Sequence, residues 1–301
     1  MPLIYTWWLL VFLIGMVVGS ALNVLIYRVA FGKSAWWPAS RCFTCFSAIR
    51  PYHNIPILGY MLLGGKCRVC KTPYSIHYVW TELGVGLLFA AMFYLDIHSR
   101  WQIQPAVWSV YYLVLMGAVP VESWLMLFYH CFWLSLAWIA LGSARLTGTI
   151  PHCYGVIAGL MGLAVGLLMP WPWPTESLDL RLWLLDVSHG PIWGMQPRPI
   201  LNPPPSGLSG HTAWLGISVA LAGACIGWLA LRFLGTTSGV LAFGVGMGAM
   251  MGWQMTLVSL ITAAGLGWGK RPLAVRLPLA MLLVILAWPW LGATMWTLLR
   301  V

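Results

Sequence analysis

Four of the seven cysteines in the chain form two C-x-x-C pairs, Cys42 with Cys45 and Cys67 with Cys70. Cysteines spaced in this way can chelate a metal ion from a tight turn, and two such pairs complete a tetrahedral four-sulfur Zn(II) site. A site closed by four thiolates leaves no open position for a substrate, so we expect the zinc to be structural. Two disulfides are the alternative, and they require an oxidising compartment.

Acidic residues near apolar segments are the second group that could do chemistry. The chain has only six Asp and Glu residues, of which Glu82 and Glu122 lie in or beside predicted membrane helices. An acid at membrane depth is costly unless it is paired or hydrated, which makes both residues weak catalytic candidates. For Glu82 the alternative is a structural pair with a loop arginine. The seven histidines are scattered, and no H-E-x-x-H metalloprotease motif occurs.

The composition excludes a soluble globular protein. Of the 301 residues, 60% are hydrophobic and 7% are charged, and the mean hydropathy is +0.83. One core cannot bury so much apolar surface, so we predict an all-α polytopic membrane protein with about seven to nine transmembrane or re-entrant helices. The net charge of +10 is spread over loops without a long basic run, so we predict no nucleic-acid binding.

Apolar segments and polar interruptions divide the chain into five parts. They are a first transmembrane helix in 1–28, a loop domain in 29–77, transmembrane helices in 78–170, a Pro-rich insertion in 171–210 and C-terminal transmembrane helices in 211–301. The first apolar segment has no small-residue cleavage site, so we expect it to be retained as a membrane helix. In the last part we expect two Gly-rich helices, Phe243–Gly252 and Gln254–Leu266.

The charge of the loop domain predicts the orientation of the protein. The loop has no acidic residue before Glu82, and its basic residues are Arg28, Lys33, Arg41, Arg50, Lys66, Arg68 and Lys71. By the positive-inside rule the loop is cytoplasmic and the N-terminus is periplasmic, as in a multi-pass protein of a bacterial inner membrane. A reducing cytoplasm favours metal-bound thiolates over disulfides, which supports the zinc prediction.

Further motifs flank the cysteines. In the first 95 residues they are Gly19–Arg28 (GSALNVLIYR), Asn54–Tyr60 (NIPILGY), Gly65–Cys70 (GKCRVC) and Tyr78–Glu82 (YVWTE), and later ones are Thr147–His152, Gly248–Gln254 and Leu277–Ala280. Together with the C-x-x-C pairs they resemble the bacterial type IV prepilin peptidases, which process type IV pilins and type II secretion pseudopilins. The resemblance implies aspartic proteolysis and S-adenosylmethionine-dependent N-methylation of the new N-terminus.

The resemblance fails at the catalytic aspartates. In the family these lie in a D-x7-D segment ending in P-D and in a G-x-G-D segment. The corresponding positions here are Ala144, eight residues before His152, and Val240, with Ala249 as a competing register for the second. Aspartic proteolysis needs two carboxyl groups that share a proton, which alkyl side chains cannot provide. We therefore predict a proteolytically degenerate member that binds pilin-like or pseudopilin helices, or an assembly protein, without cutting them.

Three alternatives remain open. Methyl transfer could persist without proteolysis, and the resemblance then implies a contribution from Gly65 and Lys66 to binding S-adenosylmethionine. An active peptidase could use a displaced acid such as Glu122, which precedes His130 by eight residues. A transporter or channel could have Glu82 in its pathway, but that class predicts inverted repeats, and the sequence has none that we detect.

The resemblance also constrains the membrane topology. It implies that Ala144 and Val240 both face the cytoplasm, which needs an even number of crossings between the loop domain and Ala144. We therefore predict that one element between Trp101 and Gly142 does not cross fully. The insertion in 171–210 is then periplasmic, and the basic segment Lys270–Arg276 is cytoplasmic.

Overall fold

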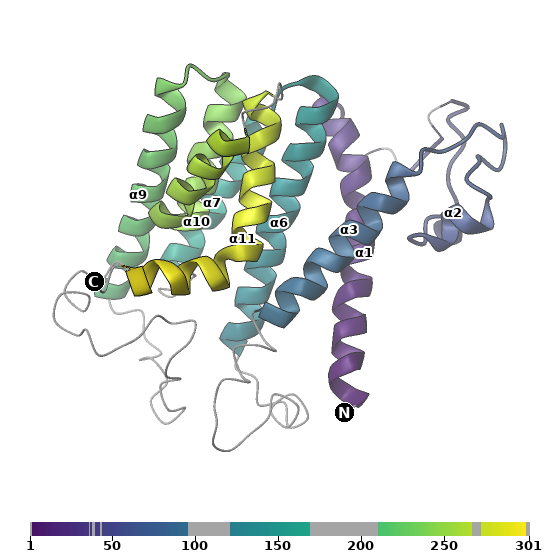
Figure 1. Ribbon diagram of the computed structural model, residues 1–301. Coiled ribbons are helices and arrows are strands. Elements are labelled where there is room, and N and C mark those ends of the chain that lie inside the picture. The colour runs from purple at the N-terminus through teal and green to yellow at the C-terminus, as the bar shows by residue number, and fades with distance from the viewer. Residues whose placement is uncertain are drawn as a thin grey trace. The chain divides into compact units, whose positions relative to one another are not determined.

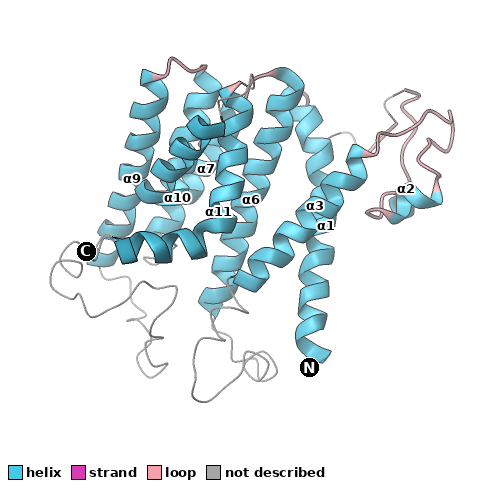
Figure 2. Ribbon diagram, viewed as in Figure 1, coloured by secondary structure: helices cyan, strands magenta, loops and turns pink. Residues whose placement is uncertain are grey.

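A computed structural model describes residues 2–35, 37, 40–42, 44–95, 121–168, 210–266 and 272–298. Throughout this part of the chain the regular elements are helices, accompanied by two isolated β-bridges, which confirms the predicted all-α class (Figure 2). Two predictions fall wholly or partly outside the described residues. They are the Pro-rich insertion, of which 171–209 are not described, and the incompletely crossing element between Trp101 and Gly142, of which 101–120 are not described.

The chain divides into two compact units, Met1–Ile97 with Tyr111–Ser135, and His98–Val110 with Leu136–Val301. The described helices of the first unit are α1 (Pro2–Ala30), η1 (Pro51–His53), α2 (Leu58–Leu62) and α3 (His77–Phe93). Helix α6 (Val121–Thr147) contains the boundary between the units. The second unit continues with α7 (His152–Leu168), α9 (Gly210–Phe233), α10 (Ser238–Gly265) and α11 (Leu273–Leu298) (Figure 1).

In the first unit, α1 packs directly against α3 through small residues. Gly15 and Gly19 are four residues apart on α1 and face α3. A methyl group added at Gly15 would lie 2.8 Å from the Cα atom of Gly86, and one at Gly19 would lie 2.9 Å from the Cα atom of Glu82. The two backbones therefore approach closely, as is typical of membrane helices with small residues at their interface.

Two helical stretches, Tyr5–Ala30 and Leu127–Thr147, are long and apolar enough to cross a membrane by length and composition. Only 22% of the most apolar part of the first stretch is buried in the protein. Large apolar side chains such as Leu9 and Val17 are more than half exposed. Exposing such a large apolar surface to water is unfavourable, whereas contact with lipid chains is not. The exposed apolar face of this helix therefore favours a membrane location.

In the second unit, a tight connection joins α6 to α7. Helix α6 ends where Gly148 adopts a φ of +73°, a conformation that favours glycine, and its N–H bonds to the carbonyl of Ala144. Pro151 precedes α7. Helix α6 therefore continues through Ala144 to Thr147.

The expectation of two Gly-rich helices between Phe243 and Leu266 is wrong, because α10 is a single helix over Ser238–Gly265. Membrane helices tolerate glycine in their interior when the glycine allows close packing. A methyl group at Gly246 would collide with the carbonyl of Gly155 on α7, and one at Gly248 with the carbonyl of Gly223 on α9. The glycines thus serve as contact points of one continuous helix.

Candidate metal centre and adjacent cavity

The two C-x-x-C pairs fold into turns with matching backbone hydrogen bonds. In the first, the N–H of Cys42 bonds to the carbonyl of Ser47 and the N–H of Phe46 to the carbonyl of Cys42. In the second, the N–H of Cys67 bonds to the carbonyl of Thr72 and the N–H of Lys71 to the carbonyl of Cys67. The loop therefore contains a repeated knuckle 25 residues apart. The sequence signal for this repeat was the spacing of the cysteines alone.

Further contacts extend the repeat. Phe46 and Lys71 occupy equivalent places and both have positive φ, at 55° and 58°. Each knuckle is flanked by one isolated β-bridge, Arg41 with Ala48 and Lys66 with Pro73. Each second cysteine also contacts a hydroxyl group two residues later. These contacts are Cys45 Sγ to Ser47 Oγ at 3.0 Å and Cys70 Sγ to Thr72 Oγ1 at 3.3 Å.

The two knuckles bring the four sulfur atoms together. All four lie within 4.8 Å of one another, with Cys42 Sγ 3.7 Å from Cys70 Sγ and Cys45 Sγ 3.8 Å from Cys67 Sγ. A tetrahedral ion with Zn–S bonds of about 2.3 Å separates its sulfurs by about 3.8 Å. All seven cysteines of the chain are free thiols. The arrangement therefore fits a four-thiolate metal ion and does not contain the alternative disulfides.

Local hydrogen bonds favour the metal-binding form of two of the thiols. The side chain and backbone of Ser47 hold the pKa of the Cys45 thiol below its usual value. The backbone N–H of Cys70 is the main cause that lowers the pKa of Cys67 to about 5. The thiolate is the metal ligand, so a pKa of about 5 keeps Cys67 in its metal-binding form at neutral pH, and the lowered pKa of Cys45 shifts that thiol in the same direction.

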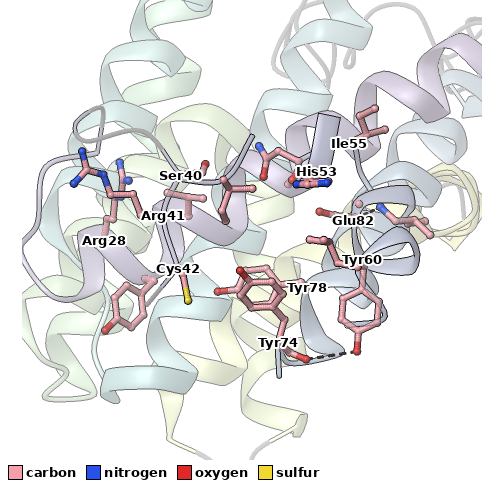
Figure 3. A pocket seen from close by; sticks show the side chains of 18 of the residues that line it. Arg28, Ser40, Arg41, Cys42, His53, Ile55, Tyr60, Tyr74, Tyr78 and Glu82 are labelled. Carbon is pink, nitrogen blue, oxygen red and sulfur yellow. Dashed lines mark hydrogen bonds between the residues drawn. The ribbon is translucent and has the colours of Figure 1, made fainter. Parts of the chain in front are cut away.

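A cavity of about 290 Å³ lies beside the cysteine cluster within the first unit. Its walls are provided by the end of α1, the loop domain and the beginning of α3, and Cys42 belongs both to the cluster and to the cavity wall (Figure 3). The aromatic wall residues are Tyr27, Phe46, Tyr60, Tyr74 and Tyr78, and the polar and charged ones are Ser20, Arg28, Lys33, Ser40, Arg41, His53, Asn54 and Glu82.

Specific contacts fix the walls of the cavity. Asn23 on α1 donates a hydrogen bond of 3.1 Å to the carbonyl of Tyr78 on α3. Arg28 donates one of 3.2 Å to the carbonyl of Ala35, which holds the beginning of the loop against α1. These bonds connect residues of the motifs Gly19–Arg28 and Tyr78–Glu82. Segments far apart in the sequence therefore meet around one space.

Glu82 is the only carboxylate among the described residues that line this cavity. It is 7% exposed, and its Oε2 accepts a hydrogen bond of 2.7 Å from the backbone N–H of Ile57. Ile57 has φ +59° and ψ −51° and lies between the carbonyl of Pro56 and the N–H of Leu58, which are bonded to each other. This geometry is a classic γ-turn, which is rare and strained. The expected partner, a loop arginine, is thus replaced by a backbone N–H.

The remaining predicted residues lie elsewhere. Gly65 is buried with φ +67° beside the ring of Tyr60, and Lys66 is exposed; neither lines the cavity. Glu122 belongs to the first turn of α6. Sequence reasoning named Glu82 as a weak candidate but missed its hydrogen-bond partner Ile57 and the aromatic cavity wall. The motif Asn54–Tyr60, which contains Ile57, was the only signal that pointed there.

Ala144 and Val240 lie at one end of the second unit. Both are almost completely buried. A methyl group at Gly239, next to Val240, would collide with the carbonyl of Ile150, which lies in the connection from α6 to α7 just after Ala144. Ala249, the competing position, is in the interior of α10 and is also buried. The sequence register thus places two apolar residues where the resemblance implies aspartates.

Comparisons with known proteins agree with the motifs. Residues 13–95 match the family model of the bacterial peptidase A24 N-terminal domain. The chain is similar to a prepilin leader peptidase/N-methyltransferase of Myxococcus xanthus, with 36% identity over 115 residues that cover 38% of this chain and 34% of the relative. The corresponding protein of Neisseria gonorrhoeae is 38% identical over 100 residues, which cover 25% of this chain and 35% of the relative.

A longer alignment extends beyond the N-terminal part. A prepilin leader peptidase/N-methyltransferase of Pectobacterium carotovorum is 27% identical over 242 residues, covering 70% of this chain and 85% of the relative. The matches to the Myxococcus and Neisseria proteins span only about a third of those relatives, 34% and 35%. No solved structure matches the chain.

Proposed function

We propose that this protein, whose residues 13–95 match the family model of the bacterial peptidase A24 N-terminal domain, is a proteolytically degenerate membrane protein of type IV pilus or type II secretion biogenesis. It binds pilin-like or pseudopilin helices, or an assembly protein, without cutting them. The observation that carries this proposal is the pair of buried apolar residues, Ala144 and Val240, at one end of the second unit.

The composition of the second unit supports this proposal. Residues 136–168 and 210–301 contain no Asp or Glu. Aspartic proteolysis requires one carboxylate that activates water and a protonated partner that donates to the carbonyl oxygen. The described helices of this unit can supply neither group. Loss of such a dyad reduces the rate by several orders of magnitude, because its members act as a unit.

A cleavage assay tests the proposal. The full-length protein, purified and reconstituted in bilayers, is incubated with a prepilin from the same organism, and leader removal is followed by mass spectrometry. We expect the prepilin to co-purify with the protein and to remain uncut. If the wild type cuts the prepilin and Glu122→Gln does not, the result would instead support an active peptidase that uses Glu122. If the wild type and Glu122→Gln both cut it, the proposal that the protein is proteolytically degenerate would be refuted.

Methyl transfer without proteolysis is the second candidate function, and the cavity in the first unit favours it. Motif residues from three segments, including Arg28, Asn54 and Glu82, meet there beside the cysteine cluster. Its tyrosines and arginines could hold S-adenosylmethionine, whose sulfonium supplies an electrophilic methyl group, and Gly65 and Lys66 adjoin Cys67. Isothermal titration with S-adenosylmethionine tests this candidate, and the absence of binding would refute it.

The placement in the cell completes the proposal. The protein lies in the bacterial inner membrane with a periplasmic N-terminus, and the loop domain 29–77 is cytoplasmic and carries structural Zn(II) on Cys42, Cys45, Cys67 and Cys70. Transmembrane parts 1–28, 78–170 and 211–301 enclose a periplasmic insertion in 171–210. Support comes from the basic loop and the sulfur geometry. Labelling of single cysteines introduced at Ser34 and Ser188 from either side tests the orientation.

A further inference from the structure

Helix α2 is apolar on two opposite faces. Gly59 and Tyr60 line the cavity of the first unit. The other face, which we call the outer face of α2, consists of Leu58 and the residues three and four positions later, Met61 and Leu62. Their side chains are 54%, 68% and 72% exposed. Such a cluster of large apolar side chains is unfavourable in water, so the outer face needs a cover.

Helix α2 lies beside α1 and α3 and not beyond their ends (Figure 1). Directly before α2, Ile57 bonds to Glu82, whose backbone packs against Gly19 of α1. Gly19 is nine residues before Arg28, which is about 13 Å along a helix. The segment from Trp8 to Arg28 is about 30 Å long, the thickness of a hydrocarbon core. Helix α2 therefore begins at a depth where α1 is within the membrane.

The backbone on both sides of α2 is suited to this depth. Lipid chains offer no hydrogen-bond acceptor, so an unpaired backbone N–H is costly there. Before the helix, the N–H of Ile57 donates to the carboxylate of Glu82. After the helix, the N–H of Gly64 donates to the carbonyl of Met61 at 3.1 Å. These donors are satisfied within the protein, as contact with a bilayer requires.

Basic residues follow α2 directly. Lys66, Arg68 and Lys71 belong to the second knuckle and are all exposed, and we call them the basic knuckle residues. Val69, between them, is 66% exposed, and the loop domain 29–77 has no acidic residue. An apolar face beside basic side chains is typical of interfacial helices, and anionic phospholipids attract such side chains. The charge of this surface thus matches an anionic bilayer.

We propose that the outer face of α2 inserts into one leaflet of the bilayer and that the basic knuckle residues bind the phosphate groups of anionic phospholipids. The loop domain is then attached to the membrane at a third point, besides its two flanking helices. The bond between Glu82 and Ile57 holds α2 at the depth of insertion. The proposal rests on the membrane crossing of α1, which is part of the proposed function, and is independent of the loss of proteolysis.

Fluorine NMR of the full-length, zinc-loaded protein in nanodiscs tests the insertion. The probe is para-trifluoromethylphenylalanine introduced at Met61 or Leu62. The same probe at Val17, an exposed residue of α1, is the reference for lipid contact, and at Thr149, in the connection from α6 to α7, the reference for water. Lipids with a nitroxide near the headgroup and a water-soluble gadolinium chelate each accelerate the relaxation of the fluorine atoms that they reach. Zinc content and thermal unfolding identify the folded variants.

We expect the nitroxide lipids to accelerate relaxation at Met61 and Leu62 at least about threefold more than the chelate does, as at Val17, because the outer face lies within the leaflet. If the chelate dominates at both positions, the outer face is in water, and if neither agent acts, protein covers it. Either result overturns the insertion while lipid contact at Val17 preserves the membrane crossing of α1. If Val17 also lacks lipid contact, that crossing and the proposal are both wrong.

Spin-labelled lipids of different charge test the basic knuckle residues. At equal mole fraction, spin-labelled phosphatidylglycerol should relax the fluorine at Met61 at least about twofold more than spin-labelled phosphatidylcholine, because anionic lipids gather beside basic side chains. Combined replacement of Lys66, Arg68 and Lys71 by Gln should remove this difference. The control Arg145→Gln, outside the loop domain, should keep it. Equal relaxation by the two lipids, or a difference that persists in the folded triple variant, would overturn the binding of anionic headgroups.

Discussion

The carboxylate of Glu82 on α3 holds the backbone N–H of Ile57 at 2.7 Å, across 25 residues of sequence. Ile57 is the central residue of a γ-turn, a conformation with positive φ that a β-branched residue rarely adopts. The bond therefore fixes a strained turn of the loop domain to the beginning of helix α3. It also places α2, which starts at Leu58, next to the cavity.

Removing this bond should loosen the loop domain. Glu82→Ala leaves the N–H of Ile57 without its acceptor and should destabilise the first unit by about 1–3 kcal/mol, the cost of an unsatisfied buried donor. Glu82→Gln preserves an acceptor and should be less destabilising. Limited proteolysis of the loop and thermal unfolding in detergent measure the difference. Equal stability of the alanine variant and the wild type would contradict a role for the bond.

The contrast between the cysteines and Glu82 shows what the sequence could predict. The spacing of Cys42, Cys45, Cys67 and Cys70 is a local property of the ligand knuckles, so a metal cluster followed from it directly. The partner of Glu82 depends on how α1 packs against α3 and on where the loop domain lies relative to them. The spacing of residues in the sequence does not predict either. For the same reason the sequence identified the motif around Ile57 without revealing that it lines a cavity.

The glycines of α10 show a second limit. Sequence reasoning divided this segment into two Gly-rich helices, Phe243–Gly252 and Gln254–Leu266. In the structure α10 is continuous, and Gly246 and Gly248 are points of close approach to α7 and α9. Packing against neighbouring helices overrides the local propensity, and the neighbours cannot be identified from the segment itself.

The metal content of the protein should depend on each of the four cysteines. We expect about one zinc ion per chain, as two C-x-x-C pairs form one tetrahedral site. Replacing any one of them, for example Cys67→Ser, should sharply reduce the zinc that survives dialysis, because binding energy of such sites is also folding energy. Cys225→Ser is the matched control, since Cys225 is exposed and outside the cluster. Metal analysis by mass spectrometry decides, and undiminished zinc in Cys67→Ser would refute the site.

Zinc retention should extend below neutral pH and fail as the pH falls toward 5. Bound zinc competes with protons for the thiolates. The hydrogen bond from Cys70 N–H lowers the pKa of Cys67 to about 5, so this ligand stays deprotonated at pH 6 and protonates only at lower pH. Bound zinc therefore stabilises the loop domain at pH values above the pKa of Cys67, and this stabilisation is lost as the pH falls through that pKa. Zinc measured after equilibration at pH 8, 7, 6 and 5 tests this, and release at pH 7 would contradict it.

The contact between α1 and α3 should not accept a single methyl group. In Gly15→Ala the new Cβ atom would lie 2.8 Å from the backbone of Gly86, so the helices must separate. We expect destabilisation of about 1–3 kcal/mol, as for other overpacked sites. Gly265→Ala adds the same group where nothing lies within 4 Å, so its stability should be unchanged or slightly higher. Thermal unfolding of both variants in the same detergent compares them, and equal effects would refute close packing at Gly15.

Restoring both acids tests the register of the second unit. Ala144→Asp together with Val240→Asp places two carboxyl groups at the end of the unit where Gly239 meets the carbonyl of Ile150. If these are the degenerate positions, the double variant should cut a prepilin that the wild type leaves intact, and neither single variant should do so, because a dyad works only as a pair. The pair Ala144→Asp with Ala249→Asp is the control for the competing register. Cleavage by that control alone would move the second position to Ala249.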